Sequence, residues 1–267
     1  MRPRFASTRG WIIAWSAVRV IVAALMIAGV IVQLRRTVNN ALTDGDHLPT
    51  VVANYFSYFT ILSNTIGALV LLWAVVWTFR AVRGERVDAG GTATPKHPLV
   101  PTEPRGLATS LAAVSTYLII TGIVYNLLLR GIQPPDPGTE WINEVHHVVA
   151  PALMLLDLFV GPLRRRLSWW TPLLSVVFPL AWVTYTMVRG PLITSPVTGN
   201  PWWYPYPFLD PNRAGGWASV WVYIVVIAVA IIAVTALTVV IARLRTPATT
   251  VGATDAGARA RREPRGS

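Results

Sequence analysis

The sequence contains no cysteine, only four histidines and few charged residues. Without cysteine the chain can form no disulfide, no thiolate nucleophile and no cysteine-ligated metal site. Charged residues make up 13% of the 267 positions and hydrophobic residues 53%, so little sequence is left for a water-soluble domain. These absences exclude disulfide-stabilised folds and thiol enzymes, and they direct attention to the apolar majority.

That majority is concentrated in six long apolar stretches. They are approximately Trp11–Gln33, Ala53–Phe79, Leu107–Leu129, Val145–Leu163, Trp169–Val188 and Trp217–Ala242. A helix needs roughly 20 residues to cross a hydrocarbon core about 30 Å thick. Only helices or closed barrels satisfy the backbone in lipid, and the stretches lack the alternation of barrel strands. We therefore predict an all-α, polytopic protein with a six-helix transmembrane domain over residues 1–245 and a disordered basic tail over 246–267.

The charges of the loops predict the orientation of this domain. The formal net charge is +11, which in a soluble protein would suggest nucleic-acid binding. Most of the 23 Lys and Arg residues, however, fall before the first stretch, between the second and third, after the fourth and in the tail. The positive-inside rule then places both termini in the cytoplasm. We expect a multi-pass protein of the plasma membrane, with membrane lipids and not nucleic acid as its partners.

Polar side chains inside the stretches are the candidate functional residues, because polar groups are costly in hydrocarbon. Ser57, Thr60 and Asn64 have the i, i+3, i+7 spacing of one helical face, and Asn143 and His147 are four residues apart. At about 1.5 Å per residue, Thr60 lies ~10 Å and His147 ~9 Å below the outer surface.

Tyr125 and Asn126, near the outer end of the third stretch, belong to the same layer. Each polar residue also has a structural interpretation: Thr60 would bond its own helix, and the asparagines would link helices. The adjacent His146 and His147 point to different sides, so His146 is an alternative base. With so few histidines, we predict no metal site and no cofactor.

Two charged residues lie inside the stretches at similar depth. Arg19 is ~12 Å and Asp157 ~9 Å from the inner surface by helical rise. We predict an ion pair between them, which would relieve the cost of burying either charge alone. The alternative is that the long Arg19 side chain extends to the cytoplasmic surface.

The outer loop between the last two stretches is rich in aromatic residues and proline, with the run NPWWYPYPFLDP. Such a segment is unlike a flexible linker. We expect it to pack against the outer end of the bundle as a lid or re-entrant segment.

Three segments together resemble the androgen-induced-gene family of six-helix membrane hydrolases. YFTIL around Thr60 is similar to the family's threonine motif, and YPFLD (206–210) to its Tyr-Pro-Phe-Leu-acid motif. WINEVHHVVAPALMLLD is similar to the Trp-x-Asn…His…Pro…acid motif, with Asn143, His147 and Asp157 at the family's spacing. Pro151 stands one residue closer to His147 than in the family. The resemblance implies a bacterial member that cleaves fatty acid esters of hydroxy fatty acids with a threonine and a histidine.

These residue types are suited to the cleavage of an ester. Thr60 would be the nucleophile and His147 the general base, with Asn143 orienting the imidazole. Asn64, Asn126 or Tyr206 would donate to the developing oxyanion. Asp157 lies ~15 Å below His147 and is too distant to complete a triad. The lipid ester would enter laterally from the outer leaflet.

Two other functions are compatible with six spans. A small-molecule transporter or channel would use the polar layer to line a pathway, and a non-catalytic membrane scaffold would keep only the fold. Polar residues continuing through the inner half would favour the transporter. Replacement of Thr60 without effect on lipid hydrolysis would favour the scaffold.

Overall fold

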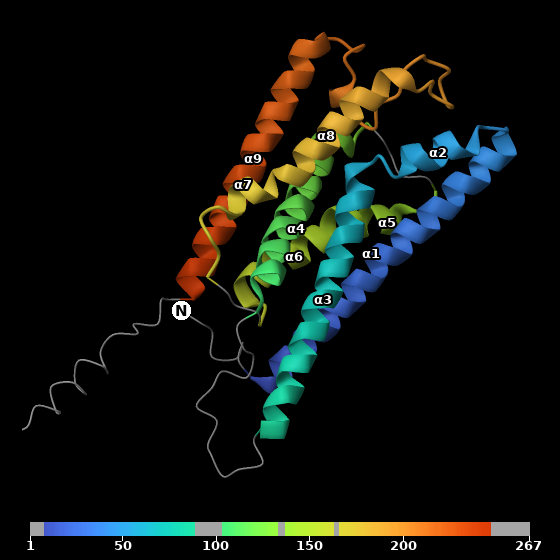
Figure 1. The fold of residues 1–267 in the computed structure, drawn as a ribbon. Coiled ribbons are helices and arrows are strands. Elements are labelled where there is room, and N and C mark those ends of the chain that lie inside the picture. The colour runs from blue at the N-terminus through green and yellow to red at the C-terminus, as the bar shows by residue number, and fades with distance from the viewer. Residues whose placement is uncertain (1–7, 89–102, 133–136, 163–165, 247–267) are drawn as a thin grey trace, which may run out of the picture.

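A computed structural model describes residues 8–88, 103–132, 137–162 and 166–246 (Figure 1). Within these ranges the regular structure is helical. The α-helices are α1 (Arg9–Asp44), α2 (Leu48–Tyr55), α3 (Phe59–Asp88), α4 (Arg105–Val124), α5 (Glu140–Glu144), α6 (Ala150–Val160), α7 (Thr171–Ser175), α8 (Val177–Arg189) and α9 (Gly216–Arg245). The predicted tail lies outside the described residues, except for Thr246.

Six helical segments of the described chain are long and apolar enough to cross a membrane, which confirms the predicted spans. They are Arg9–Asp44, Phe59–Arg83, Arg105–Leu129, Glu140–Val160, Thr171–Leu192 and Gly216–Arg245. The first continues well past its predicted end at Gln33. Its polar second half remains helical until Gly45, which adopts a left-handed conformation with φ 74° and closes the helix.

The second predicted span is wrong near its start, at the end of the bundle that we predict to face outward and call the outer end, because the chain there is not one helix. α2 ends at Tyr55 and α3 begins only at Phe59. At the break, Ser57 Oγ donates to the carbonyl of Ala53, and Trp182 Nε1 donates to the Ser57 carbonyl. These bonds replace helical ones. Ser57 therefore does not share a helical face with Thr60, contrary to the prediction from its spacing.

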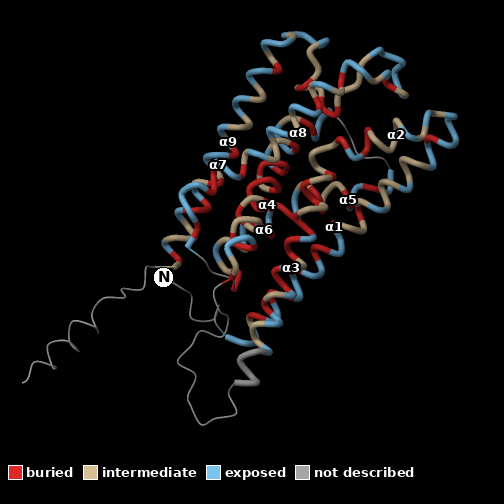
Figure 2. Tube along the Cα trace, in the orientation of Figure 1, coloured by how far each residue is buried: buried red, intermediate tan, exposed pale blue. Residues whose placement is uncertain are grey.

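The bundle is built around α4, which contacts α3, α6, α7 and α9. Its core contains fully buried side chains from four helices, Met26, Leu71, Leu118 and Met154. Buried residues gather on the inward faces, while the outer faces of α1, α8 and α9 are largely exposed (Figure 2). An exposed apolar perimeter around a packed interior is what a lipid environment requires.

Two spans contain a π-helical turn close to their outer ends, at Tyr125–Leu129 and at Val145–Val149. The two turns are adjacent, because Asn126 Nδ2 donates to the carbonyl of His147. Such turns are rare and are often found at functional sites. These two include Tyr125, Asn126, His146 and His147.

The outer segment between α8 and α9 folds back onto the bundle, as its composition predicted. Tyr206 and Leu209 are buried in a cluster with Tyr125, Leu129 and Val220. The segment therefore brings Tyr206 from a loop to the level of the polar layer.

In the inner half, Arg19 and Asp157 form the predicted ion pair. Arg19 is fully buried, and its Nε and Nη2 atoms donate to the two carboxylate oxygens at 2.9 and 2.8 Å. The indole of Trp15 donates to the same carboxylate. Asp157 thus connects α6 to α1 and does not contact His147.

Candidate active site

Thr60 lies at the second residue of α3, immediately after the break in span two. The first amides of a helix lack intrahelical acceptors. Here the Thr60 N–H donates to the Tyr206 hydroxyl at 3.2 Å. The same Tyr206 oxygen lies 3.2 Å from Thr60 Oγ1. A phenol hydroxyl accepts and donates at the same time, so Tyr206 can accept from the amide and donate its own proton to Thr60 Oγ1.

His147 lies across from this hydroxyl, with Nε2 3.4 Å from Thr60 Oγ1. Its other nitrogen, Nδ1, is 3.0 Å from the backbone carbonyl of Asn143. A carbonyl only accepts, so Nδ1 carries the proton in neutral His147 and Nε2 presents a lone pair to Thr60. A hydrogen-bonded chain therefore runs from Tyr206 through Thr60 to His147.

Of the three predicted supporting asparagines, Asn143 holds His147 as predicted, whereas Asn64 and Asn126 do not donate to the Thr60 hydroxyl. Asn143 orients His147 through its backbone carbonyl and not through its side chain. Asn64 Nδ2 donates to the Thr60 carbonyl, and Asn64 is fully buried. Asn126 Nδ2 donates to the carbonyls of Gly122 and His147, which uses both amide protons. Of the three predicted oxyanion donors, only Tyr206 reaches the Thr60 hydroxyl.

His146 is separated from this chain of hydrogen bonds. It is 1% exposed, and its Nε2 is bonded to the carbonyl of Met26 on α1 at 3.0 Å. That contact makes Nε2 a donor. The structure thus brings His147, and not the alternative base His146, to Thr60.

A second group of residues, the brace, supports His147 from the outer side; the sequence placed Tyr125 in the polar layer but singled out neither Arg130 nor Glu144. Tyr125 stacks on its ring, with centroids 3.8 Å apart and planes at 18°. The Arg130 guanidinium lies 5.4 Å from the Tyr125 centroid, bonds Asn126 Oδ1 at 2.8 Å and pairs with Glu144 at 2.7 Å. The brace connects the two π-helical turns. The sequence evidence for the Arg130–Glu144 pair was an acidic residue inside the histidine motif and a basic residue at the end of the facing span.

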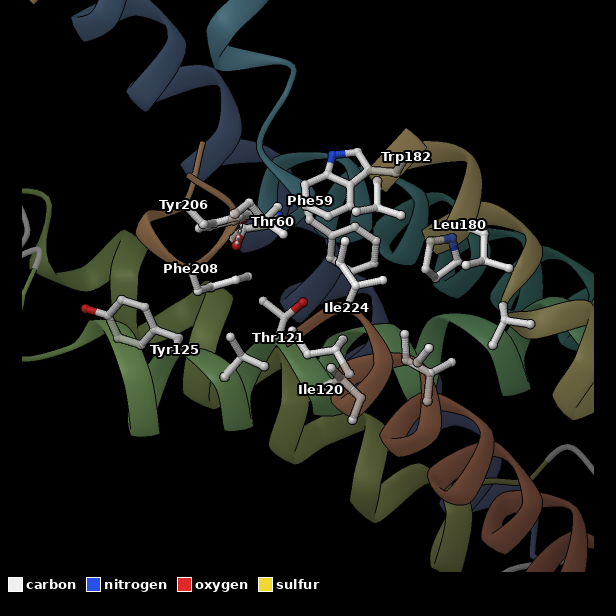
Figure 3. A pocket seen from close by; sticks show the side chains of 18 of the residues that line it. Phe59, Thr60, Ile120, Thr121, Tyr125, Leu180, Trp182, Tyr206, Phe208 and Ile224 are labelled. Atoms are coloured by element: carbon white, nitrogen blue, oxygen red, sulfur yellow. Dashed lines mark hydrogen bonds between the residues drawn. The ribbon is translucent and has the colours of Figure 1, made fainter. Parts of the chain in front are cut away.

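Two spaces meet at Thr60 and Tyr206. The first, the apolar crevice, has a volume of about 80 Å³ and is lined by residues of α3, α4, α8 and α9 and of the folded-back segment, including Phe59, Ile120, Trp182, Phe208 and Ile224 (Figure 3). Leu180 lines it and is 46% exposed, so the crevice reaches the lipid-facing surface. The second, the polar cavity, has a volume of about 480 Å³ and opens at the outer end of the bundle, beside the exposed Val197.

Tyr206 is suited to donate from this junction. Burial raises the pKa of its phenol above the ordinary value, so the hydroxyl keeps its proton at neutral pH. Among the described residues, no three His, Asp or Glu side chains are grouped as a metal site would require.

The arrangement has the parts of a nucleophilic acyl-transfer site. It holds a hydroxyl, an acceptor nitrogen with a fixed tautomer, and a neutral donor beside the positive end of a helix. Comparisons of the chain with protein-family models, with curated proteins and with solved structures give no match.

Proposed function

We propose that the protein is an integral membrane lipid-ester hydrolase in which Thr60 is the nucleophile and His147 the general base. The observation that carries the proposal is the Thr60 Oγ1–His147 Nε2 contact of 3.4 Å, with the His147 tautomer fixed by the Asn143 carbonyl. Hydrogen bonds of this kind are often long before substrate binds and shorten in the reacting complex. The resemblance to the androgen-induced-gene family supports the same pair of residues.

In the first step Thr60 Oγ attacks the ester carbonyl while its proton passes to His147 Nε2. The tetrahedral intermediate collapses when His147 returns this proton to the departing alcohol, which leaves an acyl-threonine. Water, deprotonated by His147, then attacks the acyl group, and the fatty acid leaves as Thr60 recovers its proton. The brace of Tyr125, Arg130 and Glu144 keeps the imidazole in place through both steps.

The oxyanion forms next to the first turn of α3. Tyr206 donates to this region, and the helix terminus adds a favourable potential for negative charge. Loss of one such donor lowers kcat by roughly 10²–10³-fold in characterised acyl-transfer enzymes.

The two spaces favour an amphipathic ester over a small soluble one. The acyl chain would lie in the apolar crevice and the alcohol half in the polar cavity, with the ester bond between them at Thr60. We propose that both termini face the cytoplasm, since basic residues collect at that end, and that substrate enters from the outer leaflet of the plasma membrane.

The test is ester hydrolysis by the purified full-length protein in detergent. Thr60→Ala and His147→Gln should each abolish hydrolysis of long-chain esters, and Tyr206→Phe should reduce kcat by about 10²-fold. Thr60→Ser retains a hydroxyl and should keep measurable activity. Covalent labelling of the wild-type protein with a fluorophosphonate probe, followed by peptide mass analysis, would identify the nucleophile, and the label should be absent from Thr60→Ala.

His146→Gln is the matched control, because this neighbouring histidine bonds Met26 and not Thr60. It should lower stability and leave kcat of the folded fraction within a few-fold. Hydrolysis that survives Thr60→Ala in protein of intact fold would refute the proposal.

A further inference from the structure

The lining of the polar cavity indicates what kind of alcohol half the substrate carries. Its described lining residues include amides, hydroxyls, aromatic rings and two carboxylates, but no Lys or Arg. The lining residues include Asn40, Asp44, Asp46, Asn54, Tyr125 and Trp203. A site for a phosphate or a free carboxylate normally supplies a guanidinium or an ammonium group.

The two carboxylates, Asp44 and Asp46, lie at the outer end of α1 and make no ion pair with a described residue. Two arginines near the cavity lie outside its lining and are bonded to other side chains. Arg189 donates to Asn54 Oδ1 at 2.7 Å from outside the lining, and Arg130 is paired with Glu144. Asp44 and Asp46 are therefore the charged side chains among the described lining residues, while the Arg189 guanidinium lies behind the lining, 5.5 Å from the ring centroid of Trp203.

An independent observation comes from the inner wall. Tyr125 is 6% exposed, and its hydroxyl is buried without a hydrogen-bond partner among the described residues. Tyr125 lines both spaces, and in Figure 3 its hydroxyl points away from the other side chains of the apolar crevice. A buried phenol without a partner is costly, and a ligand hydroxyl would satisfy it.

We infer that the alcohol half of the substrate is a neutral polyol, of the glycerol or sugar class, and not a group that carries a free carboxylate or phosphate. This inference rests on the proposed function. Amides and hydroxyls bind polyol hydroxyls as donors and acceptors, carboxylates accept from them, and Trp203 adds an aromatic ring to the lining. The volume of about 480 Å³ is within the range of small-molecule sites.

The experiment compares oleoyl esters that differ only in the alcohol half, hydrolysed by the full-length protein in detergent. The four alcohols are glycerol, glucose, a hydroxystearic acid with its carboxylate free, and the methyl ester of that acid. We expect kcat/KM to be highest for the polyols and about tenfold lower for the free acid than for its methyl ester, because like charges repel at the cavity. Comparison of kcat/KM between the glycerol ester and the glucose ester shows whether the cavity prefers a glycerol or a sugar as the alcohol half.

Asp44→Asn combined with Asp46→Asn should raise kcat/KM for the free acid toward that of the methyl ester, mainly through KM. Glu140→Gln is the matched control, since Glu140 is an exposed outer carboxylate that does not line the cavity. A free acid hydrolysed as well as the polyols would overturn the inference while Thr60-dependent activity upheld the proposed function. No hydrolysis of any of the esters would overturn both.

Discussion

Neutralising one member of the Arg19–Asp157 pair is expected to destabilise the protein strongly. In Asp157→Asn, the fully buried guanidinium loses the negative charge and one of the two oxygens that accept from Nε and Nη2, and an amide NH2 takes the place of that oxygen. Leaving such a charge uncompensated costs about 3–5 kcal/mol. In a protein of this size that loss lowers Tm by on the order of 10 °C.

Replacing both partners should recover part of this loss. Arg19 Nη1 has no hydrogen-bond partner among the described residues, so the pair is incompletely satisfied even in the native protein. Arg19→Met combined with Asp157→Leu removes both charges and keeps apolar volume, which is often neutral for buried pairs. Trp15→Phe removes only one further donor to the carboxylate and should cost about 1–2 kcal/mol.

The assay is denaturant and thermal unfolding in detergent for the wild type, Asp157→Asn, the single variants Arg19→Met and Asp157→Leu, and the double variant that combines the last two. A coupling energy of at least about 2 kcal/mol is expected from the cycle. If Asp157→Asn unfolds with the wild-type midpoint, or if the double variant is less stable than either single variant, the pair does not hold α1 to α6 as described.

Three further perturbations test other parts of the structure. Arg130→Met removes the partner of Glu144 and should lower kcat for ester hydrolysis about tenfold with little change in KM, whereas a purely structural role would lower only the thermal midpoint. A Cβ at Gly122 would lie 2.9 Å from Pro151 Cγ, so Gly122→Ala should cost about 1–3 kcal/mol in unfolding titrations, and wild-type stability would show that α4 and α6 are less closely packed. Burial raises the pKa of Tyr58 to about 12, above the value near 10 of an unfolded tyrosine, so its contribution to stability is complete below about pH 10 and is lost as the pH rises toward 12. Unfolding measured across that range should show a shallower loss in Tyr58→Phe, and identical profiles would count against the burial.

Hydropathy was sufficient to predict six spans, because the cost of placing polar backbone and side chains in lipid leaves few alternatives. It could not predict the break at residues 56–58, since Phe56 and Tyr58 keep the segment apolar and the break depends on Trp182, which lies in another span. The end of α1 was missed for the opposite reason. Its second half is polar enough to resemble a loop, yet it stays helical up to the left-handed Gly45.

The depth of the candidate site in the membrane could be predicted from the sequence, but most of its side-chain contacts could not. Helical rise placed Thr60 and His147 in one layer, and the structure brings them to 3.4 Å. Asn143 was predicted to orient His147, but the use of its backbone carbonyl could not be foreseen, because a π-helical turn has no distinct residue pattern. The brace through Arg130 was missed since its charge was interpreted only as part of the loop balance.

The π-helical turn Val145–Val149 has a consequence for the direction in which span four presents its side chains. An α-helix advances about 100° per residue, and a π turn closes on one residue more than an α turn. The turn therefore changes the angle about the helix axis between His147, whose side chain contacts α3, and Asp157, whose side chain contacts α1. Deleting one residue there would leave the hydropathy profile intact and rotate one of the two partners away by more than a quarter of a turn.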